Sequence, residues 1–301
     1  MSPRTSRHLP TLVATLAIVC AIGASPTNLL AQAAAGERVI LITGSTDGLG
    51  HGVALALAGP GTHILVHGRN EERGAATVAA IREAGGTARF VRADLASLAE
   101  VRALAETVRA DYDRLDVLVN NAGIWLAPER GRVLSADGHE MHFAVNYLSH
   151  YLLTHELAPL LRAAPAPRVV NVASGAQLPI DFDDPMLTTG YDDGRAYAQS
   201  KLAQVLFTFD LAEEMQGAKV NALHPASMMN TSMVLSRGAA ARSDIEEGVV
   251  AVVNLVESPA VGTGEYYNGT RPSRANRQAY DENARERLRA LSDALTGRFR
   301  S

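Results

Sequence analysis

The chain has 301 residues, of which 47% are hydrophobic and 20% charged, a composition typical of a globular protein with a large core. The formal net charge of -4 gives no electrostatic sign of a nucleic-acid partner. The single cysteine, Cys20, excludes disulfide, zinc-thiolate and thiol chemistry from the rest of the chain.

The first segment, residues 1–33, has the layout of a secretory leader. Arg4 and Arg7 precede an apolar run at 12–24, and the small residues Ala31 and Ala33 resemble a signal-peptidase site. The apolar run is shorter than the ~20 residues that a spanning helix needs, so no membrane-spanning segment is predicted. A mis-assigned start or a disordered extension is the alternative interpretation.

From residue 38 onward, strand-like and helix-like stretches alternate along the chain. The predicted strands are 38–43, 63–67, 88–92, 115–119, 168–173, 219–223 and 265–267, and the predicted helices are 53–58, 71–84, 97–111, 140–161, 197–215, 245–256 and 278–295. This alternation predicts right-handed βαβ units and a Rossmann-type α/β fold, with one doubly wound parallel sheet in a single domain over residues 37–301. Two irregular stretches, 175–195 and 225–244, follow strands at the carboxyl edge of the sheet, where we expect them to form the substrate pocket.

The turn after the first strand, TGSTDGLG at 43–50, is predicted to bind a dinucleotide phosphate. Gly44 permits a sharp turn, Gly48 a close approach of the backbone to a pyrophosphate, and Gly50 close packing of the helix on the strand. The free N–H groups at the start of that helix then face the phosphates. A purely structural glycine turn is the alternative, but the position directly after strand one favours the cofactor site.

The end of the second strand, HGRN at 67–70, indicates which dinucleotide binds. It has no acidic side chain for the adenosine ribose of NAD, whereas Arg69 could pair with a 2′-phosphate. The sequence therefore favours NADP(H), with NAD as the less favoured cofactor, unless Arg69 is simply solvated. Asp94 and Leu95 follow the third strand, where Asp94 either contacts the adenine or serves as a turn residue.

The segment YAQSK places Tyr197 and Lys201 four residues apart, on one face of the predicted helix. A free tyrosine has a pKa near 10, and a neighbouring cation favours the phenolate and lowers that pKa. The tyrosine could then exchange a proton with a substrate oxygen while hydride moves to or from the cofactor. The alternative is an ordinary surface pair on a helix.

Taken together, these motifs resemble the short-chain dehydrogenase/reductase family and in particular its retinol-dehydrogenase-like branch. The pieces follow the family's order between residues 38 and 269: TGSTDGLG (43–50), NNAG (120–123), VNYLSHYLLT (145–154), VVNVASG (169–175) and YAQSK (197–201). The resemblance to the branch lies in HGRN, NYLSHYLLT and RAYAQSKLA.

The resemblance implies a role for each matching residue. Tyr197 would be the general acid and base, and Lys201 would lower the pKa of Tyr197 and bind the nicotinamide ribose. Ser174 would hydrogen-bond the substrate oxygen. Asn146 would hold a water in a proton relay to Lys201. In isolation, Ser174 could be a turn serine and Asn146 a backbone-satisfied amide. The implied cofactor contacts are Gly44, Ser45, Thr46, Gly48, Leu49, Gly50, Arg69, Asp94, Leu95, Asn121, Ala122, Gly123, Tyr197, Lys201, Pro225 and Thr231. The sequence departs from the family at His224-Pro225-Ala226, where Pro-Gly is usual, and it places Thr231 one position from the expected contact.

The predicted function is an NADP(H)-dependent oxidoreductase that interconverts an alcohol and a carbonyl. The alternatives are a non-catalytic NADP(H)-binding sensor or scaffold, and a lyase or epimerase on the same fold. The substrate is a small molecule, and the apolar residues in 175–195 and 225–244 would suit a lipophilic one. The family analogy suggests a homo-oligomer through the helix at 197–215, and no residue spacing indicates a metal. The leader predicts an exported or periplasmic protein, whereas the need for a soluble nicotinamide cofactor favours the cytoplasm.

Overall fold

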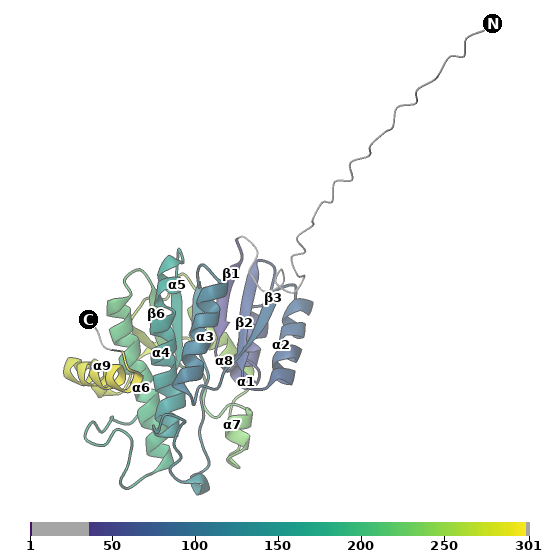
Figure 1. Ribbon diagram of the computed structural model, residues 1–301. Helices are drawn as coiled ribbons and strands as arrows, with labels where there is room; N and C mark the ends of the chain where they lie inside the picture. The colour runs from purple at the N-terminus through teal and green to yellow at the C-terminus, as the bar shows by residue number, and fades with distance from the viewer. Residues whose placement is uncertain (2–35, 299–301) are drawn as a thin grey trace. The chain divides into compact units, whose positions relative to one another are not determined.

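A single eight-stranded sheet lies at the centre of the computed structural model, which describes Met1 and residues 36–298 (Figure 1). The strands are β1 (Arg38–Ile42), β2 (Thr62–Gly68), β3 (Thr87–Arg92), β4 (Val117–Asn120), β5 (Arg168–Val172), β6 (Lys219–His224), β7 (Glu265–Asn268) and β8 (Arg271–Ser273). Their order is β3-β2-β1-β4-β5-β6-β7-β8, and all neighbours are parallel except β7 and β8. The predicted leader and Cys20 lie outside the described residues.

Helices cover both faces of this sheet, as predicted. They are α1 (Gly48–Ala56), α2 (Glu71–Glu83), α3 (Leu98–Asp111), α4 (Ser149–Glu156), α5 (Ala158–Ala163), α6 (Asp193–Glu214), α7 (Ser232–Leu235), α8 (Ile245–Glu257) and α9 (Glu282–Thr296). Side chains of a strand point alternately to the two faces, so Leu41 joins the core with α3, α4 and α6, and Ile40 and Ile42 join the core with α1 and α8. The Rossmann-type doubly wound sheet is therefore confirmed.

The predicted helix at 140–161 is wrong as one continuous element. The chain forms a π-helical stretch at Phe143–Leu148, then α4, and it restarts as α5 after Leu157. Pro159 lies in the first turn of α5, where its missing N–H and fixed φ are tolerated but would break a continuing helix. The π-helical stretch contains Asn146, one of the predicted site residues.

Two short elements were missed, and two helices begin earlier than predicted: α6, and α1, which starts at Gly48 and not at residue 53. The antiparallel strand β8 has only three residues, including Pro272, and α7 lies inside the stretch predicted to be irregular. The helix α6 begins four residues before Tyr197, because the Asp192 side chain accepts a hydrogen bond from the backbone N–H of Arg195 (2.7 Å).

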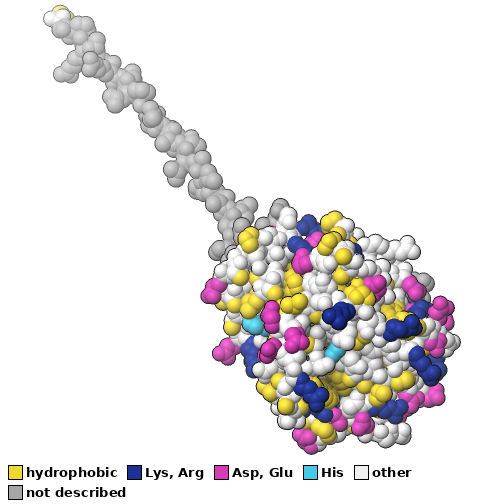
Figure 2. Space-filling model, turned by 180° about the vertical axis from the view of Figure 1, so that it is seen from behind, with side chains coloured by type: hydrophobic (Ala, Val, Ile, Leu, Met, Phe, Trp, Pro, Cys, Tyr) yellow, Lys and Arg dark blue, Asp and Glu magenta, His cyan; other side chains and the backbone are white. Residues whose placement is uncertain are grey.

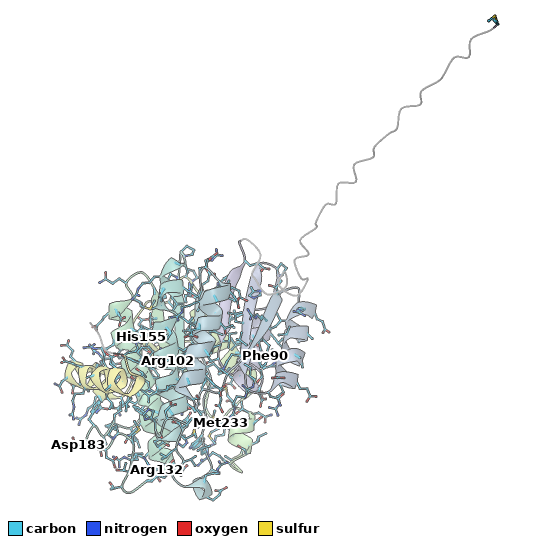
Figure 3. The ribbon with its side chains drawn as sticks, in the orientation of Figure 1. Phe90, Arg102, Arg132, His155, Asp183 and Met233 are labelled. Carbon is cyan, nitrogen blue, oxygen red and sulfur yellow. The ribbon has the colours of Figure 1, made fainter. Side chains whose placement is uncertain are left out.

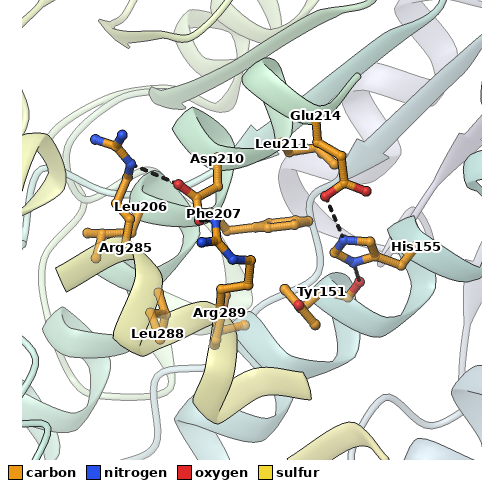
Figure 4. Close-up of a pocket in the computed structure, with 11 residues that line it drawn as sticks. Tyr151, His155, Leu206, Phe207, Asp210, Leu211, Glu214, Arg285, Leu288 and Arg289 are labelled. Atoms are coloured by element: carbon orange, nitrogen blue, oxygen red, sulfur yellow. Dashed lines mark hydrogen bonds and ion pairs between the residues drawn. The ribbon is translucent and has the colours of Figure 1, made fainter. Parts of the chain in front are cut away.

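The C-terminal helix α9 packs on α6 and α4 (Figure 4). Asp210 of α6 accepts hydrogen bonds from Arg285 Nε (2.8 Å) and Arg289 Nη1 (2.9 Å), and Tyr147 Oη lies 2.6 Å from Ser292 Oγ. The chain thus covers part of the helix that the family analogy assigns to a subunit interface. The homo-oligomer stays a prediction, and α9 limits which part of α6 could take part in it.

Charges on the surface are mixed in sign on the face shown in Figure 2. Within residues 36–298, no helix is both long and apolar enough to cross a membrane.

The Asp210 ion-pair cluster is expected to contribute strongly to stability. Its carboxylate side chain is only 14% exposed, so Asp210→Ala leaves Arg285, 11% exposed, without this partner. We expect a loss of about 2–3 kcal/mol in the free energy of unfolding, measured by urea denaturation. Asp183→Ala is the control, because Asp183 is 97% exposed and pairs with Arg287 at 3.5 Å, an exposed contact worth under ~1 kcal/mol. Equal losses in the two variants would contradict this account.

Candidate active site

The predicted site residues gather at the carboxyl ends of β1, β4 and β5 and at the start of α6. In Figure 3, Met233 of α7 and Arg132 lie at the end of the molecule where α7 is placed in Figure 1. A Cβ built on Gly123 would lie 3.4 Å from both Asn146 Oδ1 and Lys201 Nζ, and 3.8 Å from Met233 Cε. The segment NNAG, the α6 lysine and the loop carrying α7 therefore meet at one point.

The glycine-rich turn has the backbone geometry that the sequence predicted. Gly44 and Gly48 have positive φ values of +64° and +52°, which glycine adopts without strain. A Cβ on Gly44 would lie 2.9 Å from Ala122 Cα, and a Cβ on Gly50 would collide with the Gly44 carbonyl. These glycines bring β1, α1 and the segment after β4 into direct contact.

Several predicted cofactor residues turn their side chains into the protein. Ser45 Oγ donates to the Ile42 carbonyl (2.8 Å) and accepts from His67 N (3.0 Å). Leu49 and Leu95 are buried in the two cores. Thr46 lies against Gly68, where a Cβ would be 2.7 Å from its hydroxyl. Ser45, Leu49 and Leu95 can therefore offer a cofactor backbone atoms rather than side chains.

Arg69 and Asp94, both predicted cofactor contacts, lie side by side at the ends of β2 and β3. Arg69 Nη1 is 3.4 Å from Asp94 Oδ2, and the two side chains are 68% and 34% exposed. An ion pair this exposed contributes under ~1 kcal/mol, so a phosphate could replace Asp94 as the partner of Arg69.

The four predicted catalytic residues converge, and Ser174 lies beside Tyr197. A hydrogen bond from Ser174 lowers the pKa of Tyr197, but burial raises it more, so this pKa lies above 10 in the structure. The expected lowering by Lys201 is not found here, and Lys201 Nζ lies 6.0 Å from the centre of the Tyr197 ring. Asn146 Nδ2 donates to Ser200 Oγ (2.9 Å), which in turn donates to the Tyr197 carbonyl (2.7 Å).

The ammonium group of Lys201 is buried and is held by two neutral acceptors. Its Nζ donates to the Val172 carbonyl (2.8 Å) and to Gln204 Oε1 (2.9 Å). Burial lowers the pKa of Lys201 from 10.5 to about 7. A positive charge at this position is costly, and an added ligand hydroxyl or negative charge would stabilise it.

A buried network that the sequence analysis missed links Asn146 to the glycine-rich turn. Thr43 Oγ1 accepts from the N–H groups of Asn121 (2.9 Å) and Ala122 (3.0 Å) and lies 2.9 Å from His150 Nε2. Since the hydroxyl oxygen already accepts two bonds, its proton is best donated to His150 Nε2, and the ring proton lies on Nδ1. That Nδ1 donates to the carbonyl of Asn146 (3.1 Å), so Gln204 Nε2, itself a donor 3.5 Å away, is a neighbour of the ring and not its hydrogen-bond partner.

Helical spacing in the sequence could have predicted two of these buried side chains. His150 follows Asn146 by four residues and Gln204 follows Lys201 by three, so each lies on the helix face of a predicted site residue. Burial lowers the pKa of His150 to about 3, which keeps the ring neutral. The Asn146 carbonyl, which belongs to the residue predicted to hold a relay water, is here bonded to His150.

Trp125 forms one wall of the site by stacking on Tyr197. Their ring centres are 5.2 Å apart, and the Arg237 guanidinium covers the indole at 3.9 Å. Arg237 also pairs with Asp193 at the start of α6 (2.8 Å). The loop 225–244 is thereby held close to Tyr197 through Trp125 and the start of α6.

The same loop also contacts the glycine-rich turn. Ser232 Oγ donates to Asp47 Oδ2 (2.6 Å), and a Cβ on Gly48 would lie 3.3 Å from the Thr231 methyl group. Thr231 therefore lies next to the expected phosphate position, whereas Pro225 is buried against Gly248 of α8.

Two histidines pair with carboxylates, which the sequence spacing did not reveal. His142 Nδ1 lies 2.8 Å from Glu140, which also accepts from Tyr191 Oη (3.2 Å), and His155 lies 3.5 Å from Glu214. Within the part of the chain that the structure describes, no cluster of three or more His, Cys, Asp or Glu could hold a metal.

Comparisons with known proteins place this geometry in a family. Residues 38–241 match the family model described as short chain dehydrogenase. The chain belongs to the short-chain dehydrogenase family. As a member of that family it is an oxidoreductase that acts on CH–OH groups, and its relatives lie in the retinol-dehydrogenase-like branch.

Two curated short-chain dehydrogenases are similar over nearly the whole chain. Human retinol dehydrogenase 13 is 35% identical, covering 86% of this chain and 85% of its own, and polyprenol dehydrogenase of Danio rerio is 33% identical, covering 86% and 87%. Among solved structures, an uncharacterised protein of Mycobacterium paratuberculosis has 28% identity and a TM-score of 0.72, covering 87% of this chain and 94% of its own. A protein of Beutenbergia cavernae described as an NAD(P)-dependent gluconate 5-dehydrogenase, solved with bound NADP, has 30% identity and a TM-score of 0.63, covering 77% and 94%.

The Thr43 hydroxyl can be tested by an isosteric substitution. Thr43→Val leaves two backbone N–H groups and His150 Nε2 without their shared partner, and each unsatisfied buried group costs about 1–3 kcal/mol. We expect a loss of at least about 3 kcal/mol in urea unfolding. Thr107→Val, which removes a hydroxyl bonded to Ala103 of its own helix, should change stability by less than ~0.5 kcal/mol. A neutral effect at position 43 would show that the network is dispensable.

Proposed function

We propose that the protein interconverts an alcohol and a carbonyl with NADP(H), and that Tyr197 is the acid and base. The observation that carries the proposal is the placement of Tyr197 and the buried Lys201 on one face of α6, with Lys201 Nζ 6.0 Å from the Tyr197 ring centre and Ser174 beside the phenol. Ser174 can hold the substrate oxygen next to the Tyr197 hydroxyl. In reduction, Tyr197 gives its proton to that oxygen, and in oxidation it removes the proton.

The electrostatics define what a bound cofactor would have to add. Burial holds the Tyr197 pKa above 10 even with Lys201 Nζ 6.0 Å from the ring centre, and at such a pKa the phenol is a poor base. When bound, the nicotinamide supplies the hydride-transfer chemistry, and its oxidised form brings a positive charge. A charged Lys201, with its ammonium bound to a ribose hydroxyl, would add to that effect and favour the phenolate.

The preference for NADP(H) rests on Arg69, which is exposed and only weakly paired with Asp94. The end of β2 carries no carboxylate of its own to bind a ribose, and one structural relative holds NADP. The remaining predicted contacts, from Gly44 to Thr231, would surround the diphosphate and nicotinamide.

A lipophilic small molecule is the proposed substrate class. The curated relatives are named for retinol and polyprenol, two lipophilic alcohols. Of the apolar residues expected to line the pocket, Ile180 and Leu187 are instead buried in the protein, whereas Leu178 and Leu235 are 46% and 54% exposed. These two side chains are the better candidates for substrate contact.

A sensor or scaffold is not favoured, because the four residues needed for chemistry are all present and the curated relatives are dehydrogenases. Export through the leader is a separate proposal, which N-terminal sequencing of the mature protein would test.

Tyr197→Phe should bind NADP normally but lose turnover by about 10²- to 10⁴-fold, the usual contribution of a positioned acid or base. Turnover is followed by NADPH absorbance with a panel of apolar aldehydes and ketones, and binding by fluorescence titration. Tyr267→Phe, whose hydroxyl bonds Glu265, should keep its activity. Full activity of Tyr197→Phe would refute its role as proton donor.

Arg69→Ala should weaken NADP binding by about 10- to 100-fold, as expected from losing a hydrogen bond to a charged group, and leave NAD binding unchanged. Arg82→Ala is the control, because Arg82 lies on α2 and donates to the Ala88 carbonyl. Equal weakening of NADP and NAD would contradict recognition of the 2′-phosphate by Arg69.

A further inference from the structure

A cavity of about 340 Å³ lies beside Ser174, at the carboxyl ends of β5, β6 and β7. Most of its lining is polar: Gln177, His224, Tyr266, Asn268, Ser273, Arg274 and Asn276. Tyr266 Oη (2.9 Å) and Gln177 Nε2 (2.8 Å) both donate to the Ser174 carbonyl. Two residues of the lining thus hold the backbone of the serine expected to bind the substrate oxygen.

The cavity is next to that serine in space as well as through hydrogen bonds. Gly175, which follows Ser174, also lines it, and a Cβ on Gly175 would lie 3.3 Å from the His224 ring. A substrate whose oxygen lies at Ser174 could therefore extend past Gly175 into this space.

The charge of the lining is one-sided. Among the residues that the structure describes, Arg274 lines the cavity and no Asp or Glu does. In the described chain, Arg274 has no carboxylate partner, and its guanidinium lies 5.1 Å from the Tyr280 ring centre. Its neighbours Arg271 and Arg277 likewise have no carboxylate partner within residues 36–298, in contrast to Arg285 and Arg289 on α9, which share Asp210.

An unpaired guanidinium beside amide and hydroxyl groups is the arrangement that recognises an oxyanion. Arginine offers its donors in a planar fork that matches carboxylate and phosphate oxygens. Asn268 and Ser273 make no side-chain hydrogen bond within the described residues, which leaves further donors for the same group.

We propose that this cavity binds an oxyanion carried by the substrate, a carboxylate or a phosphate, with Arg274 as its main partner. The proposal rests on the function proposed above and refines its substrate class. The substrate is then an amphiphile, with an apolar body at the exposed leucines and an anionic group in the cavity.

Matched substrates test the proposal. They are para-carboxybenzaldehyde, para-formylphenyl phosphate and the neutral methyl ester of the carboxy compound, each reduced with NADPH. We expect the wild-type kcat/KM to favour at least one anionic aldehyde over the ester by about 10-fold or more, through KM. The carboxylate and phosphate arms show which oxyanion fits.

Two variants distinguish anion binding in the cavity from a general attraction of anions to surface arginines. Arg274→Ala should abolish the preference and leave reduction of the ester unchanged. Arg277→Ala removes an equally unpaired arginine three residues away that does not line the cavity, and it should keep the preference. Equal effects of the two variants, or no anionic preference in the wild type, would overturn the proposal while the reductase function stands.

A binding measurement decides the case without turnover. Calorimetry with the NADPH-loaded protein compares para-carboxybenzyl alcohol, para-hydroxymethylphenyl phosphate and the methyl ester of the carboxy compound, none of which NADPH can reduce. Tighter binding of an anionic alcohol to the wild type than to Arg274→Ala supports the cavity assignment. Equal binding, or binding of none of the three, contradicts it even if the ester aldehyde is reduced.

Discussion

The burial of the Lys201 ammonium is the constraint on which the site depends. A charge removed from water needs close polar partners, and here two neutral acceptors, the Val172 carbonyl and Gln204, hold it. Those partners do not neutralise the positive charge, and burial therefore lowers the pKa of Lys201 to about 7. The site is therefore built to gain from a ligand that adds hydroxyl groups or negative charge beside Lys201, as a dinucleotide does.

The same constraint explains why the surroundings are so fully hydrogen-bonded. The chain Thr43–His150–Asn146 joins the end of β1 to the π-helical stretch, and Asn146 joins Ser200 on α6. Each of these side chains is buried, so each lost bond would leave a costly unsatisfied group. A rigid frame of this kind fixes Tyr197 and Lys201 relative to the glycine-rich turn more firmly than the helix α6 alone could.

The loop that carries α7, on the side where substrate is expected, is held by a different set of contacts. The loop that carries α7 is fastened through Arg237 and Ser232, which pair with Asp193 and Asp47. Apolar contacts add to these, because Val234 is buried and Met229 packs against the core that contains α1 and α8. Variation among short-chain dehydrogenases in what they reduce or oxidise is expected to lie in such loops, since the sheet and the catalytic helix serve every substrate alike.

The sequence by itself determined the elements whose signal is local. The alternation of strands and helices, the three glycines and the spacing of Tyr197 and Lys201 each depend on a few neighbouring residues, and they predicted the sheet and the candidate site. Only the tertiary structure decided which distant groups meet: His150 with Thr43, Trp125 with Tyr197, and α9 with α6. Only the structure showed that the side chains of Ser45 and Leu49 point into the protein and that the predicted helix at 140–161 is interrupted. Contacts between residues far apart in the chain depend on how whole elements pack, and no short stretch of sequence carries that information.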